Sequence, residues 1–205
     1  ARAAANSLGL ELYQYLGGIN ATNLPIPMMN ILNGGAHASN NIDVQEFMIL
    51  PVGAQSVKEG IRWCAEVYTC LKKLLKKDNL SVAVGDEGGF APNLSGEEEA
   101  LALIMAAIID AGYRPGKDFM ISLDVAASEW KGDKKGHYRM PKKNVEMDTD
   151  QLISLWEDIV TNYPIFSIED PLDEEDWEGW EKITTALGDK IRLVGDDLFV
   201  TNVAR

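Results

Sequence analysis

Sulfur and imidazole ligands are scarce in this sequence, which has only two cysteines and two histidines among its 205 residues. Cys64 and Cys70 lie six positions apart within a helical pattern, a spacing that suits neither a disulfide framework nor a Cys/His zinc site. We therefore expect a protein of a reducing compartment, the cytoplasm.

Basic residues and long apolar runs are also lacking. The 19 lysines and arginines are outnumbered by 32 aspartates and glutamates, and the formal charge of −13 would repel a nucleic-acid backbone or an anionic membrane. No window reaches the roughly 18 consecutive apolar residues of a membrane span, and residues 1–16 contain no apolar core of a secretory signal. The composition thus predicts a soluble protein without a nucleic-acid partner or a membrane span.

Helical and strand-like patterns alternate along the chain, and its 46% apolar content is enough for a sizeable core. Helical patterns occupy residues 2–16, 56–77, 95–112, 148–160 and 173–187, and strand-like runs occupy residues 28–32, 44–52, 81–90, 118–128, 164–171 and 191–197. The first two strands should pair antiparallel across a short loop, whereas the β–α alternation after them predicts parallel strands with crossover helices. We predict one α/β domain over residues 1–205 with an open or barrel-like sheet.

Two Ser-x-x-Glu patterns predict where helices begin. Ser56 with Glu59 would cap the helix at 56–77, and Ser95 with Glu98 would cap the helix that follows. The apolar face of the first helix is predicted at Ile61, Cys64, Val67, Leu71 and Leu75.

Acidic residues end three of the predicted strands. The runs MISLD, FSIED and RLVGDD place Asp124, Glu169 and Asp196 at the carboxyl ends of successive strands, where α/β proteins bind ligands. Three ionised carboxylates in one place repel each other unless a cation lies between them. Mg²⁺ suits this set, because it prefers oxygen ligands and retains positions for water or substrate.

An acid at a strand end can also serve only as the N-cap of the next helix. We interpret Asp170, Asp197 and the acidic run at 173–178 in this way, as caps and solvated charge at helix starts. Asp124, Glu169 and Asp196 each end one of three successive strands, and this repetition favours a metal site over helix caps.

Two further candidates lie in glycine-rich segments. Glu87, in VGDEGGF, is bracketed by glycines that allow a sharp turn, so its carboxylate could point to the same edge and act as a general acid. The alternative is a simple turn. His37, in NGGAHASNN, is either catalytic or structural, and His137 is expected in an exposed loop.

Five segments, in this order and spacing, resemble the bacterial form of the enolase (phosphopyruvate hydratase) family: MMNILNGGAHASNNIDVQEFMI, VGDEGGFAPN, LDVAASEW, SIEDPLDEEDW and LVGDDLFVTN. The resemblance implies a modified TIM-like barrel that opens with an antiparallel ββ unit, with about six of the eight strands present. It also implies a cytoplasmic lyase that interconverts 2-phosphoglycerate and phosphoenolpyruvate in glycolysis and gluconeogenesis, a homo-oligomer at full length, and relatives found at the cell surface.

The resemblance also implies roles for individual residues. Asp124, Glu169 and Asp196 match the family's Mg²⁺ ligands, the last two also facing the substrate. Further matches are Glu87 with the acid that protonates the departing C3 hydroxyl, Glu46 with a second carboxylate beside it, and Gln45 and His37 with substrate-contacting positions. The segment around His37 resembles a mobile loop that closes over the substrate, whose glycines would permit motion and whose polarity would keep it soluble when open.

The family's catalytic base is a lysine on the strand after DDLFVTN, and the resemblance places that lysine beyond Arg205. The family's amino-terminal α+β domain would precede the chain. We therefore expect residues 1–205 to carry the metal site and the acid, and to be inactive alone.

Three other interpretations remain open. A racemase or another lyase of the enolase superfamily would share the three carboxylates. A non-catalytic binding protein would bind plasminogen, through the loop with Lys134 and Lys135, or would join an RNA-degrading assembly. The last is an α/β domain whose acids only cap helices.

Overall fold

The computed structural model describes residues 1–205 and contains an open five-stranded sheet in the order β1-β2-β3-β6-β7. The strands are β1 (Met29–Asn33), β2 (Glu46–Leu50), β3 (Met120–Asp124), β6 (Ile165–Glu169) and β7 (Arg192–Val194). β2 is antiparallel to both β1 and β3, whereas β3, β6 and β7 are parallel. The predicted α/β class with an antiparallel start is confirmed, and the sheet is not a closed barrel.

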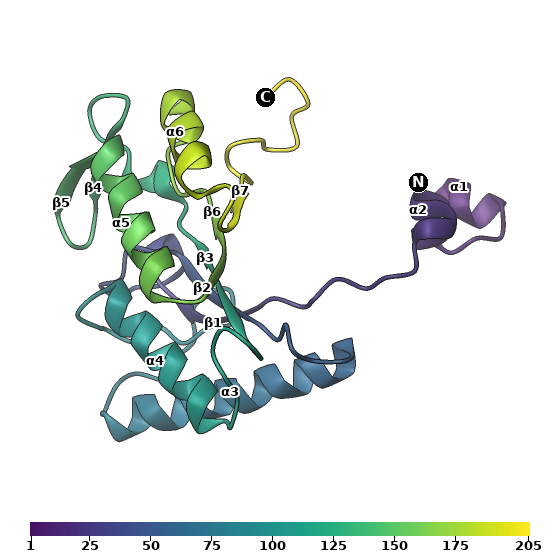
Figure 1. Ribbon diagram of the computed structural model, residues 1–205, viewed down its shortest axis with the longest axis horizontal. Helices are drawn as coiled ribbons and strands as arrows, with labels where there is room; N and C mark the ends of the chain where they lie inside the picture. Colours follow the sequence, from purple (N-terminus) through teal and green to yellow (C-terminus); the bar gives the residue numbers. More distant parts are fainter.

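Four long helices accompany the sheet: α3 (Val57–Lys77), α4 (Glu97–Asp110), α5 (Thr149–Asn162) and α6 (Trp177–Leu187). In Figure 1, α3 and α4 lie below the sheet and α5 and α6 lie beside it. One apolar core joins these layers, and its largest fully buried side chains include Trp130, Trp156 and Phe47. No helix is long and apolar enough to cross a membrane, and both cysteines are free thiols.

The amphipathic face of α3 is confirmed at four of five positions. Cys64, Val67, Leu71 and Leu75 are fully buried, but Ile61 is 48% exposed. The face begins at Gly60 instead, because this turn packs so closely on Pro51 that a β-carbon would lie only 2.9 Å from the proline Cγ. The predicted Ser56 cap is present, since its hydroxyl accepts the Glu59 amide at 3.2 Å.

The predicted helix over residues 2–16 is wrong as a single element. It consists of α1 (Arg2–Ser7) and α2 (Leu12–Gly17), followed by a 3₁₀ turn, η1 (Gly18–Asn20). Gly9, with a φ of +66°, breaks it, and the Leu10 amide turns back to the Ala5 carbonyl at 3.0 Å. Figure 1 shows this pair apart from the sheet, at the end of an extended segment.

The predicted strand at 81–90 is also wrong. The segment forms only single bridges, Val84 with Phe90 and Leu32 with Phe90, because its glycines turn the chain back on itself and the Gly85 amide bonds to the Gly89 carbonyl at 2.8 Å. Phe90 alone therefore lies beside β1 where a sixth strand was expected.

The predicted Ser95–Glu98 capping box is absent. Gly96 is the N-cap of α4, and the Ser95 amide and hydroxyl both donate to the Glu99 carboxylate, the latter at 2.7 Å.

A two-stranded hairpin, β4 (His137–Met140) and β5 (Val145–Asp148), went unpredicted. His137 is exposed, as expected, but it lies on a strand. The inward Tyr138 and Met140 alternate with the outward His137 and Arg139, which is a strand pattern visible in the sequence. Two other 3₁₀ turns, η2 (Gly35–His37) and η3 (Ala127–Trp130), follow strand ends.

Candidate active site

One row of residues crosses the whole sheet at the end where the parallel strands finish. The strand registers pair Asn33 with Glu46, Glu46 with Asp124, Asp124 with Glu169, and Glu169 with Val194. The antiparallel β2 begins at this edge, so Glu46 at its start lies level with the acids that end β3 and β6. The register thus brings three carboxylates from distant parts of the sequence into one line.

The central acids form a cluster in which Asp124, Glu169 and Asp170 offer carboxylate oxygens within 4.8 Å of one another. Burial, then the nearby Glu46, raises the pKa of Asp124 to about 6. Burial, then Asp124, raises the pKa of Glu169 to about 7. No lysine or arginine forms an ion pair with any of the three. The cluster therefore contains acidic oxygen ligands without a compensating cation from the chain.

Asp170 differs from its predicted role as a solvated helix-start charge, because it is only 2% exposed. Its carboxylate accepts the backbone amides of Asp196, Asp197 and Leu198 at 3.2, 2.8 and 3.3 Å. Asp170 directly follows β6 and turns the backbone with a left-handed φ of +44°. Asp170 is therefore the anchor of the loop after β7.

Asp196 lies on that loop, two residues beyond β7, and is exposed. It is not within the 4.8 Å group, but its charge contributes to the raised pKa of Glu169. The oxygens of Asp170 accept three backbone amides, whereas Asp196 lies on the loop next to the cluster.

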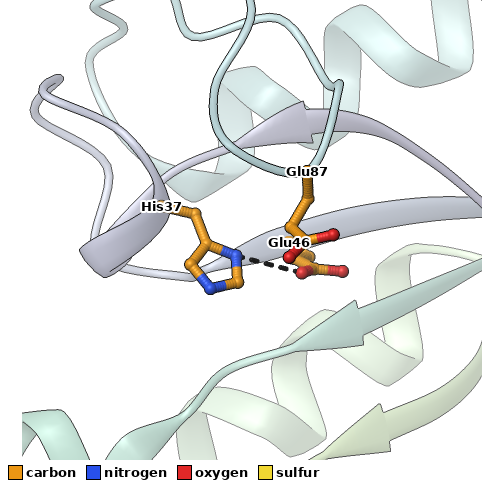
Figure 2. A group of neighbouring side chains, drawn as sticks. All are labelled: His37, Glu46 and Glu87. Carbon is orange, nitrogen blue, oxygen red and sulfur yellow. Dashed lines mark ion pairs between the residues drawn. The ribbon is translucent and has the colours of Figure 1, made fainter.

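A second group combines His37, Glu46 and Glu87 within 4.8 Å of one another. His37 Nδ1 lies 3.1 Å from Glu46 Oε1. Figure 2 shows the Glu87 side chain pointing down from its loop toward the Glu46 carboxylate. His37 lies to the left of both acids, and Glu46 comes from β2. Burial raises the pKa of Glu46, and Glu87 adds to this effect while His37 opposes it. The structure thus brings the three predicted residues together.

Gln45, next to Glu46 in sequence, contacts the first group. Its side-chain amide donates to Asp124 Oδ2 at 3.2 Å, and its backbone amide donates to the Asp124 carbonyl at 3.0 Å. Gln45, Glu46, Asp124 and Glu169 thus lie at this edge, whereas His37, Glu87 and Asp196 lie on loops beside it.

Polar side chains anchor the 34–45 loop in this conformation, and its closure over a substrate stays a prediction. Its asparagines anchor it: Asn40 donates to the carbonyls of Asn33 and Pro92, at 2.8 and 2.9 Å, and Asn41 exchanges two hydrogen bonds with Leu94. Gly34 is required for close approach, because a β-carbon there would overlap the Val44 carbonyl oxygen.

Asn33 is a residue that motif reading missed. It is fully buried beneath the Glu87 loop, and a β-carbon at Gly85 or Gly89 would overlap its side chain. Those glycines therefore allow the loop that carries Glu87 to pack directly on Asn33. The only signal in the sequence was an asparagine ending an apolar strand.

The fold and this edge define a partial α/β-barrel domain whose acidic residues gather at the carboxyl ends of its strands. The family model described as "Enolase, C-terminal TIM barrel domain" matches residues 21–205, and the chain belongs to this family.

Proposed function

We propose that the chain carries the metal-binding and acid-donating half of an active site that converts 2-phosphoglycerate to phosphoenolpyruvate, reversibly, in the cytoplasm. The observation that carries this proposal is the row of Glu46, Asp124 and Glu169 across three neighbouring strands. Membership of the enolase barrel family supports it, since the reaction class belongs to that family.

Mg²⁺ fits the residues present. Asp124 and Glu169 are acids whose pKa values are raised to about 6 and 7 by burial and by repulsion from neighbouring carboxylates, and no basic side chain pairs with them. A hard cation would remove that repulsion. Asp124, Glu169 and Asp196 would hold it, and when bound it would stabilise the negative charge that develops on the substrate carboxylate.

The second group, which contains Glu87, Glu46 and His37, supplies the proton for loss of the C3 hydroxyl. Loss of the C2 proton to a base and departure of the C3 hydroxyl form the C2–C3 double bond, and Glu87 gives the proton with which that hydroxyl leaves as water. The Glu46 carboxylate lies beside Glu87, and His37 Nδ1 lies 3.1 Å from Glu46 Oε1 in the same site. The base would be a lysine, as the resemblance to the enolase family implies.

The test is conversion of 2-phosphoglycerate, followed by the ultraviolet absorbance of phosphoenolpyruvate. We expect none from the chain alone, and Mg²⁺-dependent conversion after mixing with a polypeptide that carries the remaining barrel segments. Glu87→Gln should lower the rate by about 100-fold or more, whereas Glu146→Gln, at an exposed position on β5, should not. Conversion that is insensitive to Glu87→Gln would contradict the proposal.

A further inference from the structure

The turn of the β4–β5 hairpin reaches across to the loop that carries His37. Lys142, in this turn, donates from Nζ to the carbonyl oxygens of Gly35 and Ala38 at 2.7 and 2.8 Å, and to Asn40 Oδ1 at 3.3 Å. All three acceptors belong to the 35–40 segment, which is about 100 residues away in sequence. Together they satisfy the three donors of one ammonium group.

The turn that presents Lys142 is itself fixed. Asp43 is fully buried and accepts the backbone amides of Lys142 and Lys143 at 2.8 and 3.1 Å. The Lys143 side chain pairs instead with Glu97, at the start of α4, and Glu97 accepts the Asp43 amide at 3.1 Å. The two neighbouring lysines thus have separate partners, and only Lys142 contacts the His37 loop through its side chain.

The far side of the same loop contacts the Glu87 loop. The Asp86 amide donates to the His37 carbonyl at 3.2 Å, one residue before Glu87. The 35–40 segment is therefore held between Lys142 on one side and the Glu87 loop on the other. A shift at Lys142 would be passed to both His37 and Glu87.

We propose that Lys142 is a positioning residue that holds the 35–40 loop, and with it His37 and Glu87, in the arrangement of the candidate site. Its effect on catalysis rests on the proposed function. The mechanical part does not, because the ligand-free chain tests it.

The first test is amide hydrogen exchange in the ligand-free chain. Lys142→Met keeps the aliphatic stem and removes the ammonium, so exchange of the Gly35 and Asp86 amides should rise about tenfold or more, while amides of α5 stay unchanged. Lys143→Met is the matched control and should leave the loop protected. Lys142→Arg should retain most of the protection, since a guanidinium can donate to the same carbonyls.

A second measurement is nuclear magnetic resonance of the Lys142 ammonium and the His37 imidazole. In the unaltered chain, the Lys142 ammonium should give a slowly exchanging ¹⁵N–¹H signal, identified by its loss in Lys142→Arg. The chain has only two histidines, so the His37 imidazole resonance is easily followed, and it should move in Lys142→Met but not in Lys143→Met.

Unchanged loop exchange in Lys142→Met, or equal loss in Lys142→Met and Lys142→Arg, would overturn the proposal. These outcomes are independent of Mg²⁺ binding and of turnover, so failure of the proposed function would be seen separately.

Discussion

Asp124 and Glu169 are ordinary carboxyl groups whose chemistry is set by their position. Each ends a strand, each is partly buried, and the register makes them direct neighbours, so burial and repulsion both favour the protonated form. A bound cation would reverse this preference. The same two residues therefore control both metal affinity and the stability of the metal-free chain.

The pH dependence of stability follows from the raised pKa values of about 6 for Asp124 and about 7 for Glu169. A carboxyl pKa that is higher in the folded chain stabilises the fold fully below its unfolded value of about 4, and this stability is lost as pH rises through the folded value. The melting temperature of the metal-free chain should therefore fall between pH 5 and pH 8 in calorimetry. The double variant Asp124→Asn/Glu169→Gln should flatten this fall, and a melting temperature that rises over the same range would contradict it.

Asp170 should matter for stability more than an exposed acid does. Asp170→Ala leaves three backbone amides without their acceptor, and we expect a loss of about 3 kcal/mol of unfolding free energy in urea titrations. Asp150→Ala, which breaks an exposed pair with Lys182, should cost less than about 1 kcal/mol. Equal losses of unfolding free energy in the two variants would contradict the anchoring role of Asp170.

Among the elements, the Glu87 loop depends on its close approach to Asn33. Gly89→Ala would drive a β-carbon into the Asn33 side chain and to within 2.7 Å of the Leu32 amide nitrogen, and should cost about 2 kcal/mol or more. Gly88→Asn is the control in the same loop, because Gly88 has open space around it and a φ of +84° that asparagine tolerates. Thermal denaturation of the two variants measures the difference, and similar melting temperatures would refute this packing.

The corrected face of α3 can be tested in the same way. Leu71→Ala removes a fully buried side chain and should cost about 2–5 kcal/mol. Ile61→Ala, at an exposed position on the same helix, should change stability by less than about 0.5 kcal/mol. A large loss of stability in Ile61→Ala would instead support the apolar face predicted from the sequence, which included Ile61.

Local apolar spacing predicted the elements that bury one continuous face. It failed where contacts with distant residues determine the conformation of the segment. The elements β3, β6, α3 and α5 were predicted because their apolar residues follow the spacing of a buried strand or helix face. The 81–90 segment has a strand's composition, but its pairing depends on glycines lying against Asn33, which no local pattern contains.

Some residues of the candidate site could be proposed from local sequence patterns and others could not. An acid at the end of an apolar run gave Asp124, Glu169 and Asp196, and glycines around an acid gave Glu87. Asp170 and Lys142 were not predictable, because their partners are backbone groups whose positions only the fold defines.

In the whole molecule, the acidic edge is one feature of a chain with a net charge of −13. Such a chain attracts cations generally, so a specific site must be distinguished from a diffuse one. Exposed acids elsewhere, such as Asp133 in the loop before β4 and Glu146 on β5, provide the comparison.

The most direct test of the account is a calorimetric titration of Mg²⁺ into the chain at pH 8 and about 0.15 M salt, where surface attraction is screened. We predict one site, weakened about tenfold or more in each of Asp124→Asn, Glu169→Gln and Asp196→Asn, and unchanged in Asp133→Asn and Glu146→Gln. An affinity that is the same in all five variants would contradict a magnesium site at the carboxyl edge of this sheet.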